Sequence, residues 1–200
     1  MQNTFVMWPL TPSKALSLAA PGIPELRTPR LKLRALTTSD TEVVYRAIDA
    51  NRDEFSRWFT WSRSASRDSV YEGLRTASVR MITGSEWHLG IFDHEDRFVG
   101  RIGLSEINRK ARTAELGYWL GREFAGDGYM TEAAGALLAF ATAKAPARIT
   151  AFADTENAAS RRVLEKLGFR WIRTVPRAIQ HQERGWRDHE QYVLTAGRNA

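Results

Sequence analysis

The chain has 200 residues, of which 43% are hydrophobic and 26% are charged, and its formal net charge is +6. This size suits one globular domain with its own core, and the absence of cysteine excludes disulfides, thiolate metal sites and a cysteine nucleophile. The chain has no apolar run of about 18 residues, which excludes a membrane-spanning helix, and its basic residues are scattered among acidic ones, so nucleic acid is not an expected partner.

The first 25 residues differ from the rest of the chain. Prolines at positions 9, 12, 21 and 24 interrupt the apolar run that follows Met1, and no basic residue precedes that run. This pattern is not that of a secretory signal, and the lack of cysteine accords with a reducing compartment. We therefore expect residues 1–25 to be a flexible extension, residues 26–200 to form the folded domain, and the protein to be cytoplasmic.

The first part of the folded domain is predicted to form one strand followed by helices. Residues 30–34 alternate basic and apolar side chains, as a half-buried strand does. Thr37–Asp40 supply N-cap side chains before a helix with apolar positions 43, 44, 47 and 48. A short helix is expected within 51–61, and apolar residues at 70, 74, 77 and 81 indicate a longer helix that ends at Gly84.

The middle of the chain is predicted to form antiparallel strands. Strands over 87–92 and 98–104 make a hairpin around the turn at His94–Asp96. A second polar turn at 108–110 leads into an aromatic-rich strand over 113–120.

The last part of the domain alternates helices and strands. A helix with apolar positions 133, 134, 137, 138 and 141 is followed by a break at 145–147, a strand over 148–153 and a helix that ends at Gly168. Strands over 169–175 and 190–195 close the chain, with a polar excursion over 176–189 between them. This order predicts a mixed α/β sheet with helices on both faces, in which 113–120 and 148–153 are the parallel neighbours.

A glycine-containing loop joins the strand over 113–120 to the next helix. Gly126 and Gly128 lack Cβ atoms where that helix begins, so backbone N–H groups can face a ligand. Those groups and the positive end of the helix dipole favour an anion, most naturally a phosphate. Taken alone, the loop fits equally well a tight turn that uses glycine for its geometry.

Several segments, in register over about residues 26–195, together resemble the GCN5-related N-acetyltransferase (GNAT) superfamily, and within it the RimJ/RimL branch. These segments are Thr28–Arg34, 51–61, Glu115–Leu120, Gly126–Ala133, Asn157–Ser160, Leu164–Phe169 and Gly185–Glu190. The resemblance implies a twisted mixed sheet, mostly antiparallel, with helices on both faces. It also implies a split between the fourth and fifth strands, here 113–120 and 148–153.

The resemblance further implies acetyl-CoA as the co-substrate. Its pantetheine arm would pair with the backbone at Trp119 and Leu120 in the split, Asn157 would bond a pantetheine amide, and Ser160 would face the sulfur. Its pyrophosphate would lie on the backbone N–H groups of Gly126, Asp127, Gly128, Tyr129, Met130 and Thr131.

Two positions depart from the pattern of the family. Ala125 stands where the family usually carries Gln or Arg, and Asp127 lies between the two glycines, where a basic or neutral residue is usual. Because a carboxylate repels a pyrophosphate, we expect the Asp127 side chain to point to solvent, with Arg122 partly offsetting its charge.

Acetyl transfer to an amine needs a neutral amine, donors for the developing oxyanion and a proton for the leaving thiolate. Glu115 is the candidate acceptor of the amine proton, directly or through water; the alternative is an ion pair with a nearby arginine. By the resemblance, Ser160 is the candidate proton donor to the thiolate; the alternative is a hydroxyl bonded within the first turn of its helix. Such weak bases favour an α-amine, with a pKa of about 7.7–8.0, over a lysine side chain at about 10.4.

The remaining candidate residues are aromatic or histidine. Trp58 and Trp61 are candidate walls of an acceptor pocket, although core packing explains each equally well. The histidines share no metal-ligand spacing, so surface or turn positions are expected for them and no metal is predicted. They are His88, His94, His181 and His189.

The sequence thus predicts an acetyl-CoA-dependent N-acetyltransferase whose acceptor attacks directly in a ternary complex, with a protein or peptide N-terminal α-amine as the leading acceptor. One alternative is a small amine such as a polyamine, an aminoglycoside or an amino-acid-like metabolite. Another is a non-catalytic acyl-CoA-binding module, which Ala125 and Asp127 make conceivable. A homodimer is also left open.

Overall fold

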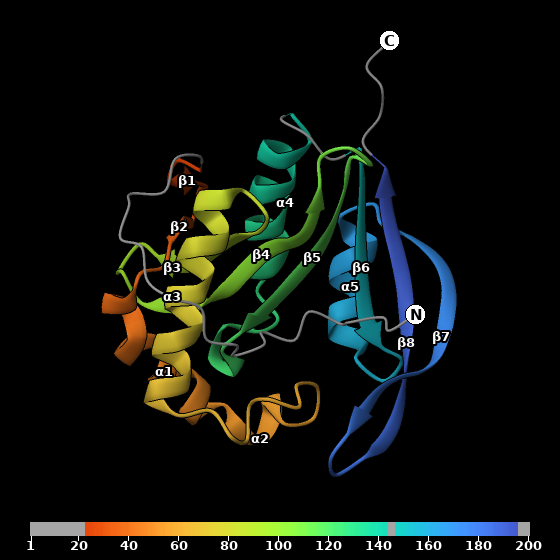
Figure 1. The fold of residues 1–200 in the computed structure, drawn as a ribbon, viewed down its shortest axis with the longest axis horizontal. Helices are drawn as coiled ribbons and strands as arrows, with labels where there is room; N and C mark the ends of the chain where they lie inside the picture. The colour runs from red at the N-terminus through yellow and green to blue at the C-terminus, as the bar shows by residue number, and fades with distance from the viewer. Residues whose placement is uncertain (1–22, 144–146, 196–200) are drawn as a thin grey trace.

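A twisted eight-stranded sheet runs through the computed structural model, which describes residues 23–143 and 147–195 (Figure 1). In chain order the elements are β1 (Leu26–Arg27), β2 (Leu31–Ala35), a 3₁₀ turn (Thr38–Asp40), α1 (Thr41–Ala50), α2 (Arg52–Phe55), α3 (Arg67–Thr83), β3 (Trp87–Asp93), β4 (Phe98–Asn108), β5 (Thr113–Leu120), a second 3₁₀ turn (Arg122–Phe124), α4 (Tyr129–Thr142), β6 (Arg148–Asp154), α5 (Ala158–Lys166), β7 (Arg170–His181) and β8 (Gly185–Thr195). Their order in the sheet is β1-β2-β3-β4-β5-β6-β8-β7. The predicted mixed α/β sheet is confirmed.

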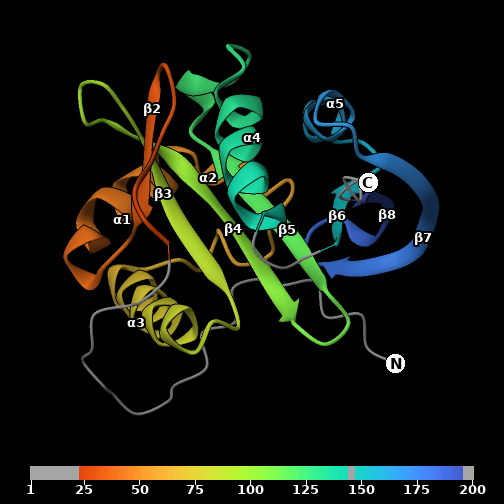
Figure 2. The ribbon, with the colours of Figure 1, turned by 90° about the horizontal axis from the view of Figure 1, so that it is seen from above.

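Helices cover both faces of the sheet. The pair α1 and α3 packs on one face, and α4 and α5 pack on the other (Figure 2). The predicted apolar positions of α4, from Ala133 to Ala141, are all buried in the larger core cluster. Val44, Ile48 and Leu74 belong to a smaller cluster under α1 and α3. Within the described residues, no helix has both the length and the apolar character that a membrane crossing requires.

The sheet splits between β5 and β6, the one parallel pair among the described strands. Pairing runs from Thr113 opposite Arg148 to Leu116 opposite Ala151 and stops there, while β5 continues along β4 as far as Leu120. The two strands diverge beyond that point (Figure 1). The predicted parallel pair and split are therefore confirmed. Over residues 117–120, the edge of β5 that faces β6 is not paired with that strand.

The C-terminal part of the sheet differs from the prediction. Residues 176–189 are not a polar excursion, because β7 extends to His181 and β8 starts at Gly185, so the two strands form one long hairpin. Most side chains of β7 are exposed because it is an edge strand. Polar side chains on the solvent-exposed face of an edge strand cost little free energy, so the polar composition of 176–189 did not indicate a loop. The predicted break at 145–147 and the extension at 1–25 fall mostly outside the described residues.

Candidate active site

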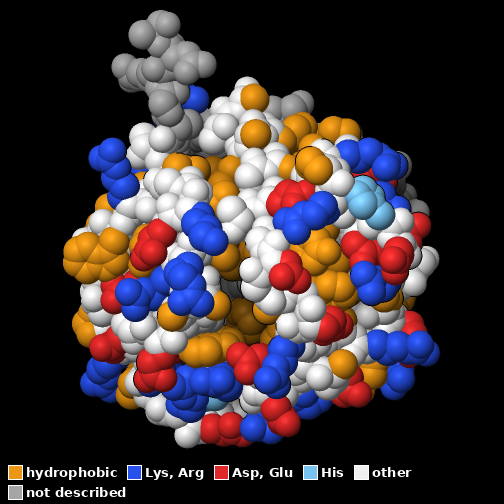
Figure 3. All heavy atoms as spheres, turned by 180° about the vertical axis from the view of Figure 1, so that it is seen from behind, with side chains coloured by type: hydrophobic (Ala, Val, Ile, Leu, Met, Phe, Trp, Pro, Cys, Tyr) orange, Lys and Arg blue, Asp and Glu red, His pale blue; other side chains and the backbone are white. Residues whose placement is uncertain are grey.

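A cavity of about 740 Å³ lies where β5 and β6 separate. Its walls come from β4, β5, the glycine loop, the first turns of α4 and α5, and the segment that follows α2. Figure 3 shows the surface hollowed near its centre, with hydrophobic side chains inside the hollow and charged side chains around it. The split thus opens into a cavity with apolar walls and polar groups at its margin.

The glycine loop forms one end of this cavity. Gly126 and Gly128 have φ of +103° and +80°, a region that side chains with a Cβ rarely adopt. Gly128 is the N-cap of α4 and provides no side-chain bond, so the first N–H groups of α4 remain available to a ligand. Residues Gly126 and Gly128–Thr131 line the cavity. Asp127 does not line it and is exposed.

Residues from the N-terminal part of the domain brace this loop. The Arg30 guanidinium donates to the Glu132 carboxylate at 2.6 Å and to the Asp127 carbonyl at 2.9 Å, and the Thr28 hydroxyl donates to Glu132 at 2.6 Å. Although partial burial alone would raise it, these bonds hold the pKa of Glu132 below its usual value. This brace joins residues about a hundred positions apart, so no local pattern in the sequence indicates it.

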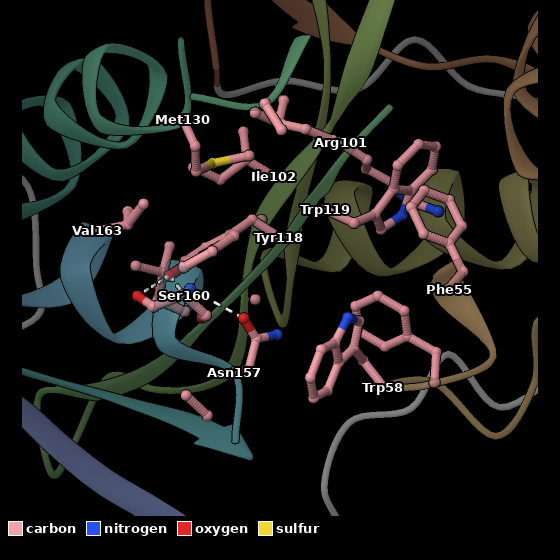
Figure 4. A pocket seen from close by; sticks show the side chains of 18 of the residues that line it. Phe55, Trp58, Arg101, Ile102, Tyr118, Trp119, Met130, Asn157, Ser160 and Val163 are labelled. Atoms are coloured by element: carbon pink, nitrogen blue, oxygen red, sulfur yellow. Dashed lines mark hydrogen bonds between the residues drawn. The ribbon is translucent and has the colours of Figure 1, made fainter. Parts of the chain in front are cut away.

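The start of α5 supplies a second group of polar atoms. Asn157 is the N-cap of α5, and its Oδ1 accepts from the Ser160 backbone N–H at 3.0 Å. The Ser160 Oγ lies 3.0 Å from the Tyr118 hydroxyl, which also donates to the Ser160 carbonyl at 3.2 Å. Burial raises the pKa of Tyr118 to about 12, so its hydroxyl is protonated at neutral pH. Figure 4 shows this Tyr118–Ser160–Asn157 group on one side of β5.

The opposite face of β5 presents different residues, because side chains alternate along a strand. Trp119 packs against Phe55 with ring centroids 5.1 Å apart, on the α1–α3 side. Glu115 lies on this same side of β5, is half-buried and lines the cavity. The predicted wall residues Trp58 and Trp61 also line the cavity. The structure therefore brings Glu115 and Ser160 to one cavity from opposite faces of the sheet.

Three of the four histidines are buried, contrary to the expectation of surface positions. His88 and His189 both line the cavity, and His181 places its Nε2 2.6 Å from the Ser56 carbonyl. His94 is exposed, as expected. Within residues 23–143 and 147–195, no group of three His, Asp or Glu side chains is placed to hold a metal ion. Spacing along the chain could not reveal these positions, because each is buried by elements remote in sequence.

The tip of the β7–β8 hairpin packs against the segment that follows α2. The Arg184 guanidinium donates to the Arg57 carbonyl at 2.9 Å, and Arg63 pairs with Glu183 at 2.5 Å. These contacts tie the hairpin to the segment that carries Trp58.

Comparison with known proteins identifies the family. Residues 30–170 match the model of the acetyltransferase (GNAT) domain. The chain belongs to the GNAT family. This acetyltransferase is 34% identical over 151 residues to the protein named probable N-acetyltransferase YjcK of Bacillus subtilis (strain 168), with 72% of this chain and 82% of that protein covered.

Solved structures show the same fold. The RimL ribosomal L7/L12 alpha-N-protein acetyltransferase in complex with coenzyme A superposes with a TM-score of 0.80 at 19% identity, over 84% of this chain and 95% of the other. Mycobacterium smegmatis RimJ, in complex with CoA-disulfide, gives 0.76 at 25% identity, over 83% and 82%. The predicted RimJ/RimL-like assignment is confirmed, and this protein is an acetyl-CoA-dependent N-acetyltransferase.

Proposed function

We propose that this acetyltransferase transfers an acetyl group from acetyl-CoA to the N-terminal α-amine of a protein or peptide. The observation that carries the proposal is the cavity itself. It continues from the split, past the open edge of β5, to an aromatic-walled space beside Trp58 and Trp61 that can admit the end of a chain. The similarity to RimL, which is named for α-N-acetylation of a ribosomal protein, supports the same acceptor class.

In this proposal the glycine loop and the split hold the donor. The pyrophosphate lies against the first N–H groups of α4, where the helix dipole favours negative charge. The pantetheine arm follows the open edge of β5 at Trp119 and Leu120, and Asn157 bonds one of its amides. Asp127 is exposed and does not line the cavity, so its carboxylate is screened by solvent and opposes the pyrophosphate less than its place in the sequence implies.

The chemistry is a direct attack of the amine on the thioester carbonyl. A C–N bond forms, the C–S bond breaks, and the amine loses a proton to Glu115, directly or through water. The departing thiolate takes a proton from the Ser160 hydroxyl, which lies 3.0 Å from the Tyr118 hydroxyl, and water then returns a proton to Ser160 while Glu115 releases the amine proton to water. Binding both reactants in one cavity supplies much of the rate without a covalent intermediate.

The acceptor's own pKa argues for an α-amine. At pH 7.5 roughly a third of an α-amine is neutral, against about one part in a thousand of a lysine side chain. Glu115 is the candidate base on the acceptor side, and an ordinary carboxylate deprotonates an alkylammonium poorly. An acceptor that is already partly neutral therefore fits this cavity best.

The test is coenzyme A release, measured by thiol detection across N-terminal peptides, polyamines, aminoglycosides and amino acids. We expect peptides to be the best acceptors. We also expect Ser160→Ala and Glu115→Gln to lower kcat by about ten- to a hundredfold, while acetyl-CoA still binds in calorimetry. Ser78→Ala is the matched control, because its hydroxyl bonds the Leu74 carbonyl within α3, away from the cavity.

Each other outcome has a definite meaning. Better turnover with small amines would replace the peptide acceptor with a metabolite. Coenzyme binding without transfer to any amine would indicate a non-catalytic acyl-CoA-binding module. Unchanged kcat in both variants would remove Ser160 and Glu115 from the mechanism.

A further inference from the structure

An open space lies over the middle of the sheet, at Gly117. This residue is exposed although it belongs to β5, an inner strand of the sheet, and a Cβ built on it would meet no heavy atom of the described residues within 4 Å. Because side chains alternate along a strand, Gly117 shares a face with Trp119, which packs against Phe55 on the α1–α3 side. The space above Gly117 therefore lies on that side of the sheet, and Gly117 lines the cavity there.

Apolar side chains wall this part of the cavity. Trp119 lies 5.1 Å from Phe55 between ring centroids, and Phe55 lies 6.0 Å from Phe59, which stacks on Trp61 at 5.4 Å. Figure 4 shows Phe55 and Trp119 across the pocket from Ser160. The four rings line the cavity together with aliphatic side chains of α1 and α3, among them Val44 and Leu74. Such walls favour an apolar group, which gains free energy by leaving water.

The charged side chains beside this space balance one another. The Glu86 carboxylate accepts from the Arg80 guanidinium at 2.7 Å and lies 2.6 Å from His88 Nε2. Burial lowers the pKa of His88 to about 4, so this imidazole is neutral at pH 7. Arg101 and Glu115 both line the cavity and carry opposite charges, so the two guanidinium groups and the two carboxylates sum to zero. A neutral acceptor side chain fits this balance better than a charged one, which would lose water without gaining a partner.

The Trp58 ring is already engaged by cations of the protein. The guanidinium carbons of Arg57 and Arg184 lie 5.1 and 5.6 Å from the ring centroid, and the ring Nε1 donates to Glu54 at 3.1 Å. The face of an aromatic ring attracts a cation, and here the protein itself supplies it. The aromatic wall therefore does not by itself indicate a polyamine or another cationic acceptor.

The segment that carries Trp61 is held in place by Arg52. The Arg52 guanidinium donates to three carbonyl oxygens that follow Trp61, at 2.7, 2.9 and 3.1 Å, namely those of Ser62, Arg63 and Ala65. A wall that is already fixed before the acceptor arrives loses little conformational entropy when the acceptor binds. The apolar wall is therefore built for binding without a large rearrangement.

We propose that the space above Gly117 receives an apolar side chain of the acceptor, so that the preferred substrates begin with a large aliphatic or aromatic residue. An N-terminal leucine, methionine or phenylalanine of a peptide has this chemistry, and so does the corresponding free amino acid. This inference rests on the proposed function and specifies its acceptor.

The first test compares acceptor peptides that are identical after the first residue. Coenzyme A release is measured for peptides that begin with leucine or asparagine, and with methionine or glutamine, which are pairs of similar shape and different polarity. We expect kcat/KM to favour the apolar member about ten- to a hundredfold, the range that burial of one large apolar side chain gives. A ratio near one, or a preference for the polar member, overturns the inference.

The second test places the apolar subsite at Gly117. Gly117→Ala adds one methyl group to the space, so it should lower the kcat/KM ratio of leucine-first to alanine-first peptides about three- to tenfold, while acetyl-CoA binds as before in calorimetry. Gly135→Ala is the matched control, because Gly135 lies in α4, does not line the cavity, and its Cβ would also meet no heavy atom of the described residues within 4 Å. An unchanged ratio in Gly117→Ala, or an equal change in Gly135→Ala, overturns the assignment.

Binding of the product gives a readout without turnover. With coenzyme A present, N-acetyl-leucyl peptides should bind the wild type at least tenfold more tightly in calorimetry than N-acetyl-asparaginyl peptides, and equal affinities would contradict the subsite. A leucine preference confined to free amino acids would support the subsite and replace the peptide acceptor of the proposed function. Transfer to polar-first peptides alone would refute only this inference, whereas no transfer to any amine would refute the proposed function and this inference with it.

Discussion

Mild acid is expected to destabilise this acetyltransferase through His88. Burial lowers the pKa of this side chain from 6.5 to about 4; the bond with Glu86 opposes the change and Arg101 adds to it. Above pH 6.5 the imidazole is neutral in both the folded and the unfolded chain and contributes nothing. Between about pH 6.5 and 4 the unfolded chain takes up a proton that the folded chain excludes, so the free energy of unfolding falls as the pH falls.

The size of the effect follows from the two pKa values. One pKa unit corresponds to about 1.36 kcal/mol, so the full loss is about 3 kcal/mol and the loss between pH 7.5 and 5.0 is about 2 kcal/mol. The hydrogen-bonded carboxylates of Glu132 and Asp154 lose their stabilising contribution at lower pH, below about 4. A comparison of pH 7.5 with pH 5.0 therefore reports mainly on the buried histidines, and because burial also lowers the pKa of His189, the His88 share is the difference between the wild type and a His88 variant.

Urea denaturation followed by tryptophan fluorescence measures this difference. His88→Gln keeps a donor for Glu86 without a titrating ring, so we expect this variant to lose much less stability than the wild type between the two pH values. His94→Gln changes an exposed histidine and should behave as the wild type does. An equal loss in His88→Gln and the wild type would refute the reasoning.

Three further predictions concern the site. Gly117→Val should leave the melting temperature unchanged, since its Cβ would meet no atom within 4 Å, but it should lower kcat/KM at least tenfold because the side chain fills the open space of the cavity above residue 117. Full activity would show that acceptors do not pass through that space. Glu132→Gln should weaken acetyl-CoA binding in calorimetry about three- to tenfold, because Arg30 and Thr28 would then brace the loop through neutral bonds; an unchanged Kd would contradict that role. Tyr118→Phe should lower kcat about ten- to a hundredfold with little change in the acetyl-CoA Kd, and a Kd change alone would assign it to binding.

Local patterns in the sequence were sufficient to predict most of the helices and strands of the fold. The apolar spacing from Ala133 to Ala141 predicted the buried face of α4, and the glycines at 126 and 128 predicted the loop before it. A strand, a crossover helix and a second strand also predicted the parallel pair of β5 and β6. Each of these features depends on residues close together in the chain, so periodicity and turn chemistry were enough to indicate them. The full length of the β7–β8 hairpin could not be predicted, because a mostly polar edge strand shows little of the alternation of apolar and polar residues that indicates a strand.

The tertiary structure alone decided which side chains meet. Tyr118 and Ser160 are 42 residues apart and bond only because α5 follows β6 across the split from β5. His88, Glu86 and Arg101 lie together because β3 and β4 pair in one register, and that register also places Gly117 beside them. A sequence fixes which groups a chain carries and which way each strand alternates. The relative placement of strands and helices determines which groups lose water together, and hence their charge, their pKa values and the ligand they can receive.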